Sequence, residues 1–382
     1  MKKDSRIIEI DIIRGVSILG IFIVNILIFQ YGLIGYEYID FKSELDKCTR
    51  ILVDILAENS FLPIFSFLFA YNLILFINKN KDRSLKWLLI RRFIFLVSLG
   101  FIHHMLLWEG DILLTYGLTG IVLLPFIRLT PKKLLYTISI ISLLSIIKFY
   151  PIDNVNPKFI SSFIEKANHI YQSKNYLNTV SFRFNEHPYN MSASLFLLAH
   201  FFTIVLSLVP YLLGIYAAKT NFFRKTNFKN KKLYVFSFLL FTLGIIIKVL
   251  PYLYPQVQLF GALKLGIGGV ILGVSYILIT SIIVNHSKMN NILFPLSYVG
   301  KTSFSNYILQ SLFGTFLFYG YGFNQFSKLG VLNSIIIAFV FYIFQVWLSY
   351  TWLKHFKFGP LEHLWRIFIY QGKKSIKKEK AA

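Results

Sequence analysis

The stretch IIRGVSILGIFIVNILIFQYGLI, residues 12–34, decides the fold class. A helix needs about 20 mostly apolar residues to cross a hydrocarbon core of about 30 Å, and this stretch carries Arg14 as its one charged residue. Met1, Lys2 and Lys3 precede it, as in a secretory signal peptide. The apolar run is longer than the apolar region of such a peptide, and no small-x-small cleavage site follows. We therefore predict an uncleaved first transmembrane helix.

Similar apolar runs recur along the chain. Hydrophobic residues make up 55% of its 382 residues and charged residues 15%, against roughly 25% charged in soluble domains. This composition predicts an all-α, polytopic transmembrane helix bundle with about ten spans. The spans are expected near residues 12–34, 52–77, 87–107, 112–127, 134–150, 193–218, 233–254, 259–284, 303–318 and 331–353.

Basic residues gather in alternate connections between these runs. Lys and Arg crowd segments 78–92 and 219–232 and the chain after Lys354, whereas connections 35–50 and 108–111 carry Asp and Glu. Cytoplasmic connections are enriched in Lys and Arg, so both termini are predicted to be cytoplasmic, with the protein multi-pass in the plasma membrane. The same pattern argues against nucleic acid as the reason for the net charge of +23, because no single basic groove remains.

Two segments fall outside the predicted spans. Within a transmembrane domain of residues 1–353, residues 151–192 form a long outer loop, which is expected to be either a functional lid or disordered. Residues 354–382 are expected to form a cytoplasmic interfacial helix and a polybasic tail. The helix begins at Pro360, and its apolar face is predicted to lie on the inner leaflet, where anionic lipids attract the basic loops and tail.

Several motifs occur in a fixed order along the chain: DIIRG at 11–15, FLPIFSFLF at 61–69, LGFIH at 99–103, GDIL at 110–113, NYILQS at 306–311, FYGYG at 318–322 and FGPLEHLWR at 358–366. As an ordered set they resemble the YeiB-like family of bacterial membrane proteins over nearly the whole chain. One departure is Ala70, where the family usually has glycine, so helix packing there is expected to be slightly looser.

The resemblance implies a bacterial plasma-membrane protein. It also implies a looser kinship to the membrane-embedded acyltransferases, which begin with a similar Asp/Arg-Gly signature. Those enzymes carry acyl groups from the cytoplasmic side to sugars or other acceptors outside. Their active histidine lies shortly after the first span, whereas this chain has no histidine before His103.

Polar groups within spans are costly, so each indicates either function or helix packing. His103 lies near the outer end of the third predicted span, with Asp111 in the tight turn that follows. An imidazole whose tautomer is fixed by a carboxylate is suited to act as a general base, so we predict His103 and Asp111 as catalytic residues. Glu58 is a second candidate for the orienting carboxylate, or it forms an ion pair with a cation such as Lys264. The alternative for His103 is a structural histidine.

Four further residues are predicted to bind substrate. Arg14 and Asn25 lie eleven residues apart on nearly the same helix face, and Arg14 either pairs with Asp11 or binds a phosphate or carboxylate. Asn306 and Gln310 belong to a polar stripe on the ninth predicted span. Such a stripe either joins helices or lines a water-filled path.

Three functions remain open. The chain either transfers an acyl-type group from a cytoplasmic donor such as acyl-CoA to a lipid or glycan acceptor outside, or transports or flips a small amphiphile, or acts as a non-catalytic scaffold or sensor. We favour transfer, because matching halves with Gly/Pro-broken helices, which indicate transporters, are not evident. No metal is expected, since no carboxylate–histidine pattern recurs at ligand spacing and Cys48 is the only cysteine.

Overall fold

The computed structural model describes residues 7–80, 84–148, 157–186, 204–205, 207–286 and 290–371. Within these ranges the chain is helical, as predicted, and contains no β-strand. Five segments there are long and apolar enough to cross a bilayer: Ile8–Tyr31, Glu44–Lys79, Lys231–Leu253, Gln258–Val284 and Val331–His355. The chain is therefore an all-α membrane protein, while about ten spans stay a prediction.

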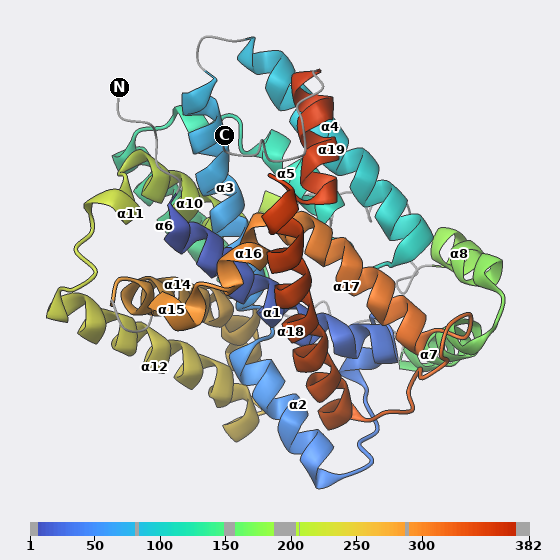
Figure 1. Cartoon of the computed structure of the whole chain (residues 1–382). Helices are drawn as coiled ribbons and strands as arrows, with labels where there is room; N and C mark the ends of the chain where they lie inside the picture. The colour runs from blue at the N-terminus through green and yellow to red at the C-terminus, as the bar shows by residue number, and fades with distance from the viewer. Residues whose placement is uncertain are drawn as a thin grey trace.

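The elements follow one another along the chain as shown in Figure 1. They are α1 (Ile8–Tyr31), η1 (Gly35–Glu37), α2 (Glu44–Leu56), α3 (Phe61–Lys79), α4 (Leu85–Ile102), η2 (His103–Leu107), α5 (Leu113–Val122), η3 (Phe126–Arg128), α6 (Pro131–Lys148), α7 (Pro157–Gln172), α8 (Tyr176–Asn185), α10 (Val209–Lys219), α11 (Phe222–Lys225), α12 (Lys231–Leu253), α13 (Gln258–Leu263), η4 (Lys264–Gly268), α14 (Gly269–Val284), α15 (Asn290–Leu293), α16 (Leu296–Lys301), α17 (Ser303–Phe318), α18 (Val331–His355) and α19 (Pro360–Tyr370).

Helix α1 lies at the centre of the bundle and contacts α3, α14, α16, α17 and α18 (Figure 1). Its backbone touches that of α16, because a Cβ atom added at Gly300 would lie 1.8 Å from the carbonyl oxygen of Asp11. In the same way, a Cβ at Gly15 would lie 2.2 Å from the carbonyl oxygen of Leu296. Glycines on both helices thus permit the close approach that is typical of helix packing in membranes.

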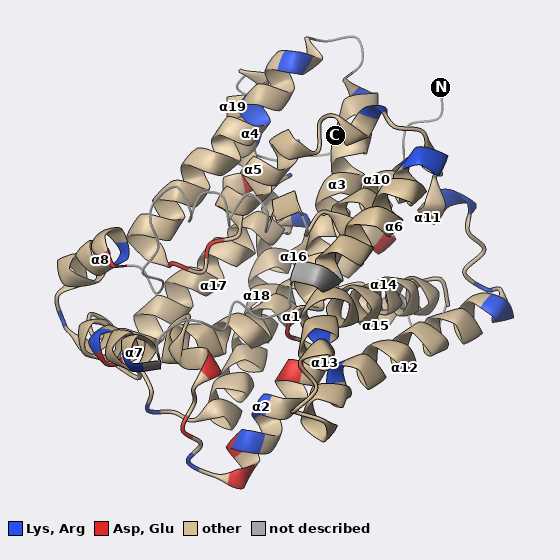
Figure 2. Cartoon of the chain, turned by 180° about the vertical axis from the view of Figure 1, so that it is seen from behind, with Lys and Arg blue, Asp and Glu red and all other residues tan. Residues whose placement is uncertain are grey.

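One end of the bundle gathers the start of α1, the start of α17 and the end of the chain. Arg14 Nη1 donates to the Gly300 carbonyl oxygen at 2.9 Å, and Arg91 Nη1 donates to that of Ile369 at 3.3 Å. The charged residues at this end, uppermost in Figure 2, are mainly Lys and Arg. These bonds join α1 to α16 and α4 to α19, while the cytoplasmic position of both termini stays a prediction.

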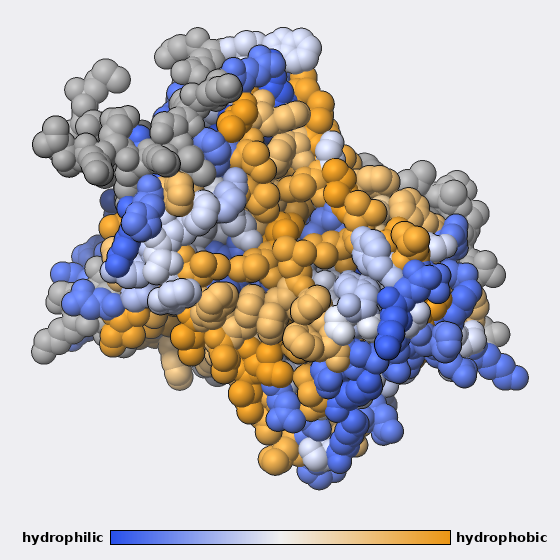
Figure 3. Space-filling model, turned by 45° about the vertical axis from the view of Figure 1, so that its right-hand side comes forward, coloured by the Kyte–Doolittle hydropathy of each residue, from blue (hydrophilic) through white to orange (hydrophobic). Residues whose placement is uncertain are grey.

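Apolar side chains cover much of the surface between the two ends (Figure 3). They include residues of α12 and α18 that are more than half exposed: Phe238, Leu239, Val340, Ile343 and Trp347. A contiguous exposed apolar surface of this kind is suited to contact with lipid tails.

The second predicted span, 52–77, is not one continuous helix. Helix α2 ends at Leu56 and α3 begins at Phe61, and Asn59 between them has φ 54°. Asparagine tolerates this left-handed conformation better than most residues. The break lets the carbonyl of Asn59 reach Gly269, where an added Cβ would lie 2.0 Å from its oxygen. Glu58 consequently lies in a turn and not within a helix, which corrects the prediction.

The predicted outer loop 151–192 contains two helices, α7 and α8, so residues 157–172 and 176–185 are helical and not disordered, while the outer position stays a prediction. Apolar side chains of these helices, including Tyr171 and Phe182, are buried against the bundle. Residues 151–156 and 187–192 lie outside the described chain, as do most of the predicted span 193–218 before α10 and the polybasic tail after residue 371.

Helix α19 begins at Pro360, as predicted, and packs against α4. The rings of Phe95 and Phe368 lie 5.4 Å apart, and the Arg92 guanidinium lies 5.1 Å from the Trp365 ring. Its carboxylate Glu362 caps α17: Oε1 accepts hydrogen bonds from the backbone nitrogens of Phe304 at 2.8 Å and Ser305 at 3.2 Å. Oε2 accepts from the Ser305 hydroxyl at 2.6 Å.

Replacing Glu362 with Ala is expected to lower the free energy of unfolding by about 1–3 kcal/mol, because it leaves buried donors at the N-terminus of α17 unpaired. Burial raises the pKa of the Glu362 carboxyl, and the hydrogen bonds from Ser305 and Phe304 oppose this rise by stabilising the carboxylate. Thermal unfolding of the purified protein in detergent measures the loss. Glu362→Gln keeps one acceptor oxygen, so its stability should lie between those of wild type and Glu362→Ala. Wild-type stability in Glu362→Ala would contradict the capping role.

Candidate active site

His103 begins a π-helical segment at the end of α4. In this segment, residues 103–107, the backbone nitrogen of Trp108 donates to the carbonyl oxygen of His103 at 2.8 Å, five residues back. Such π-helical insertions occur frequently at functional sites, because they redirect a side chain that a regular helix would place elsewhere. The side chain of His103 is buried. The chain thus departs from regular helix geometry at its strongest catalytic candidate.

His103 and Asp111 form a buried pair, as the sequence predicted. His103 Nδ1 lies 2.8 Å from Asp111 Oδ1, with the two side chains 2% and 0% exposed. Asp111 Oδ2 accepts a hydrogen bond from the backbone nitrogen of Leu114 at 2.7 Å, which fixes the carboxylate at the start of α5. Within the described chain, neither His103 Nδ1 nor Nε2 makes a hydrogen bond, so the contact of Nδ1 with Asp111 Oδ1 is an approach to ion-pair distance. The carboxylate thus lies next to one imidazole nitrogen, and the other nitrogen is left for a further group.

Aromatic rings surround this pair. The imidazole of His103 lies 5.4 Å from the Tyr307 ring and 6.5 Å from the Trp108 ring. Tyr307 Oη accepts from the backbone nitrogen of Ile112 at 3.2 Å and donates to the Gly110 carbonyl oxygen at 3.4 Å, so it holds the turn that carries Asp111. A low-dielectric lining of this kind strengthens electrostatic interactions inside it.

Gly100, one turn before His103, allows α4 and α5 to meet next to the pair. A Cβ added at Gly100 would lie 2.2 Å from the backbone nitrogen of Leu114. Leu114 is the residue whose nitrogen binds Asp111. The close contact of the two helices therefore sets the position of the carboxylate relative to the imidazole.

Helices α7 and α8 cover the π-helical segment. Tyr171 Oη donates to Glu109 Oε2 at 2.7 Å, and Tyr176 Oη donates to the Leu106 carbonyl oxygen at 2.5 Å. Arg183 Nη1 donates to the Met105 carbonyl oxygen at 3.4 Å. Sequence analysis missed this cover because it took residues 151–192 as a loop; the apolar spacing within α7 was the available signal.

Arg183 of α8 is buried and has side-chain donors without hydrogen-bond partners in the described chain. It is 4% exposed, and its guanidinium lies 5.8 Å from the Tyr319 ring. Within the described chain, Arg183 Nε and Nη2 and the hydroxyl of Tyr319 have no hydrogen-bond partner. A guanidinium with unpaired donors is suited to bind a carboxylate or phosphate.

Glu58 belongs to a different cluster. Its Oε2 is 3.0 Å from both Arg50 Nη1 and Tyr36 Oη, and none of the described contacts joins it to His103. Lys264 pairs with Asp54 instead of Glu58, which corrects the predicted partner. Lys248 donates to the Glu58 carbonyl oxygen and, at 3.2 Å, to Ser60 Oγ. The carboxylate next to His103 is therefore that of Asp111, whereas the carboxylate of Glu58 pairs with Arg50.

Arg14 and Asn25 lie on one face of α1 but in different surroundings. Arg14 Nη1 contacts Asp11 Oδ1 at 3.2 Å, which is the predicted pair, at the basic end of the bundle. Asn25 is partly buried and lies one turn before Phe29, whose ring is 4.1 Å from that of Trp108. Asn25 is thus on the side of the histidine, and Arg14 is at the opposite end of the helix.

Asn306 and Gln310 are buried in hydrogen bonds between helices. Asn306 Nδ2 donates to Ser349 Oγ at 2.9 Å, Gln310 Nε2 donates to Gln345 Oε1 at 2.9 Å, and Gln345 Nε2 returns to the Asn306 carbonyl oxygen at 2.9 Å. Gln310 Nε2 also lies 3.4 Å from the Ile18 carbonyl oxygen. The stripe joins α17 to α18 and α1, which favours the packing alternative over a water-filled path.

Comparison with known proteins agrees with this description. A family described as Protein of unknown function (DUF418) matches residues 217–372. Uncharacterized protein YxaH of Bacillus subtilis is 29% identical, and the alignment covers 98% of this chain and 97% of the relative. Uncharacterized protein YeiB of Escherichia coli is 26% identical, with 94% and 95% covered. No solved structure matches the chain.

The apolar helices and these bacterial relatives define a bacterial membrane protein. The family model and the relatives YxaH and YeiB support the resemblance to the YeiB-like family that the sequence motifs predicted. Among the described residues, no group of three or more His, Cys, Asp and Glu side chains is placed to hold a metal ion.

Proposed function

We propose that this protein transfers an acyl-type group to an acceptor at the outer side of the membrane, with His103 as the general base. The observation that carries the proposal is the buried His103–Asp111 pair, whose Nε2 atom is unpartnered in the described chain. A positioned imidazole of this kind contributes roughly 10²–10⁴-fold to rates that depend on proton transfer.

The proposed step begins when His103 Nε2 accepts the proton of an acceptor hydroxyl. The hydroxyl oxygen bonds to the acyl carbonyl carbon, and the bond from that carbon to the donor's leaving atom breaks. The imidazolium then returns the proton to the leaving group; for a thioester donor such as acyl-CoA this yields a free thiol. Asp111 stabilises the imidazolium and holds its tautomer, and Arg183 offers a place for an anionic part of the acceptor.

The donor assignment rests on the likeness to membrane-embedded acyltransferases. Arg14 bonds to Asp11 and to the Gly300 carbonyl, so its role in donor binding is a proposal that its contacts do not favour. The hydrogen bonds that Asn306 and Gln310 donate to α18 likewise give transport less support than transfer. A scaffold or sensor would leave His103 replaceable without loss.

The test compares membranes that contain wild-type protein, His103→Ala or His104→Ala after incubation with labelled acyl-CoA. Label is measured in outer lipids and glycans. His104 is the matched control, because it is the neighbouring imidazole and is not part of the pair with Asp111. We expect label with wild type and His104→Ala and a loss of at least 10²-fold with His103→Ala. Equal label from both variants, with the proteins folded and equally abundant, would reject the proposed base.

A further inference from the structure

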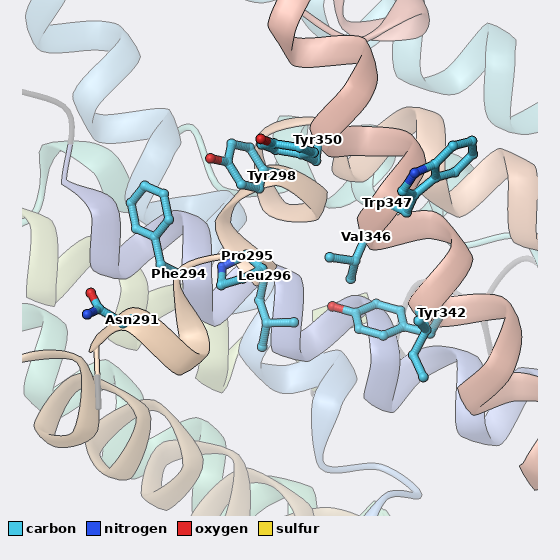
Figure 4. Close-up of a pocket in the computed structure, with 10 residues that line it drawn as sticks. Asn291, Phe294, Pro295, Leu296, Tyr298, Tyr342, Val346, Trp347 and Tyr350 are labelled. Carbon is cyan, nitrogen blue, oxygen red and sulfur yellow. The ribbon is translucent and has the colours of Figure 1, made fainter. Parts of the chain in front are cut away.

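An apolar groove lies between α15–α16 and α18, and neither His103 nor Asp111 lines it. Its volume is about 690 Å³, within the range of ligand pockets, and its lining includes Phe294, Leu296, Tyr298, Val346, Trp347 and Tyr350 (Figure 4). At its base, Tyr342 Oη donates to the Gly15 carbonyl oxygen at 2.8 Å, which ties the groove floor to α1. The groove is thus formed by the packed helices and not by a loose loop.

The mouth of the groove is exposed. Two residues there, Ile343 and Trp347, are 68% and 58% exposed on the apolar surface of α18. Near the end of α18, Trp352 Nε1 donates to the Phe358 carbonyl oxygen at 2.9 Å, in the turn that leads to α19. An occupant would therefore enter sideways from the lipid phase and not from water.

Two tyrosines and two lysines form the polar rim of the groove. The rings of Tyr298 and Tyr350 lie 5.1 Å apart, and both line the groove (Figure 4). Lys354 Nζ lies 4.3 Å from the Tyr350 ring, and Lys301 Nζ lies 5.5 Å from the Tyr298 ring. Basic pockets between membrane helices bind anionic lipid headgroups, and tyrosines are enriched at headgroup level.

We propose that this groove binds one anionic phospholipid of the leaflet at the basic end, with an acyl chain along Val346 and Trp347 and its phosphate beside Lys354. The apolar lining matches a hydrocarbon chain, and the cations and hydroxyls at the rim match a phosphodiester. The lining of the groove includes neither His103 nor Asp111, so this inference does not depend on the proposed function.

The experiment measures the lipids that the purified protein retains, by native mass spectrometry, from equal mixtures of phosphatidylglycerol and phosphatidylcholine with identical acyl chains. We expect one retained lipid per chain, with phosphatidylglycerol preferred. A lysine near a headgroup contributes about fivefold, so Lys354→Gln should reduce the preference by about that factor. Val346→Trp should fill the groove and remove the retained lipid, whatever its headgroup.

Val340→Trp is the matched control, because Val340 is 62% exposed on the same helix and does not line the groove. It should retain lipid as wild type does. If Val346→Trp does not fold, Ile343→Trp at the exposed mouth provides the same obstruction. Equal retention by the groove and control variants, an unchanged preference in Lys354→Gln, or equal binding of the two headgroups by wild type would each overturn the proposal.

Discussion

Asp111→Asn is expected to lower the transfer rate by on the order of 10²–10⁴-fold while the protein stays folded. Asparagine keeps an oxygen for the backbone nitrogen of Leu114, so the start of α5 retains its hydrogen bond. Its amide N–H₂ would then face His103 Nδ1, where the carboxylate now lies 2.8 Å away. That contact favours the tautomer with the proton on Nε2, which can no longer accept a proton from the acceptor.

The measurement is initial label transfer at saturating acyl donor, with thermal unfolding recorded for each variant. The double variant His103→Ala/Asp111→Asn should be no slower than His103→Ala alone, because Asp111 acts through the imidazole. If the two losses multiply instead, Asp111 has a role separate from the histidine. Wild-type activity in Asp111→Asn would show that the pair is structural.

Asp54→Asn is expected to destabilise the protein by about 3–5 kcal/mol, because it removes one partner from a buried charged cluster. Asp54 is 2% exposed and pairs with Lys264, and it also accepts a hydrogen bond from Tyr252. Lys248, 1% exposed, lies in the same cluster next to Glu58. Without the Asp54 charge, Lys264 loses its ion-pair partner, and the nearby Glu58 carboxylate already pairs with Arg50.

Adding Lys264→Met should restore much of the stability, since the double variant removes a cation together with the anion. Thermal or chemical unfolding in detergent measures the four members of this cycle. Lys47→Met is a control on the same helix as Asp54, because Lys47 and its partner Glu44 are exposed by 53% and 86% and should contribute little. If the two single losses of unfolding free energy add up in the double variant, Asp54 and Lys264 do not stabilise the protein through their ion pair.

The sequence by itself determined the features that rest on local spacing. Apolar runs of about 20 residues predict membrane helices whatever their partners, because each span must satisfy its own backbone hydrogen bonds. The pairing of Asp11 with Arg14 and of His103 with Asp111 was also predictable, since few residues separate the members of each pair.

Only the tertiary structure decided the contacts between distant segments. Lys264 pairs with Asp54 and not with Glu58, because the helix is interrupted between α2 and α3. Hydropathy does not predict an interruption within a continuous apolar run. Glu362 binds the start of α17, which lies more than fifty residues earlier in the sequence. Helix α8 packs on the π-helical segment of His103, which is also distant in sequence. Such contacts depend on how helices pack side by side, and the periodicity of one helix carries no information about its neighbours.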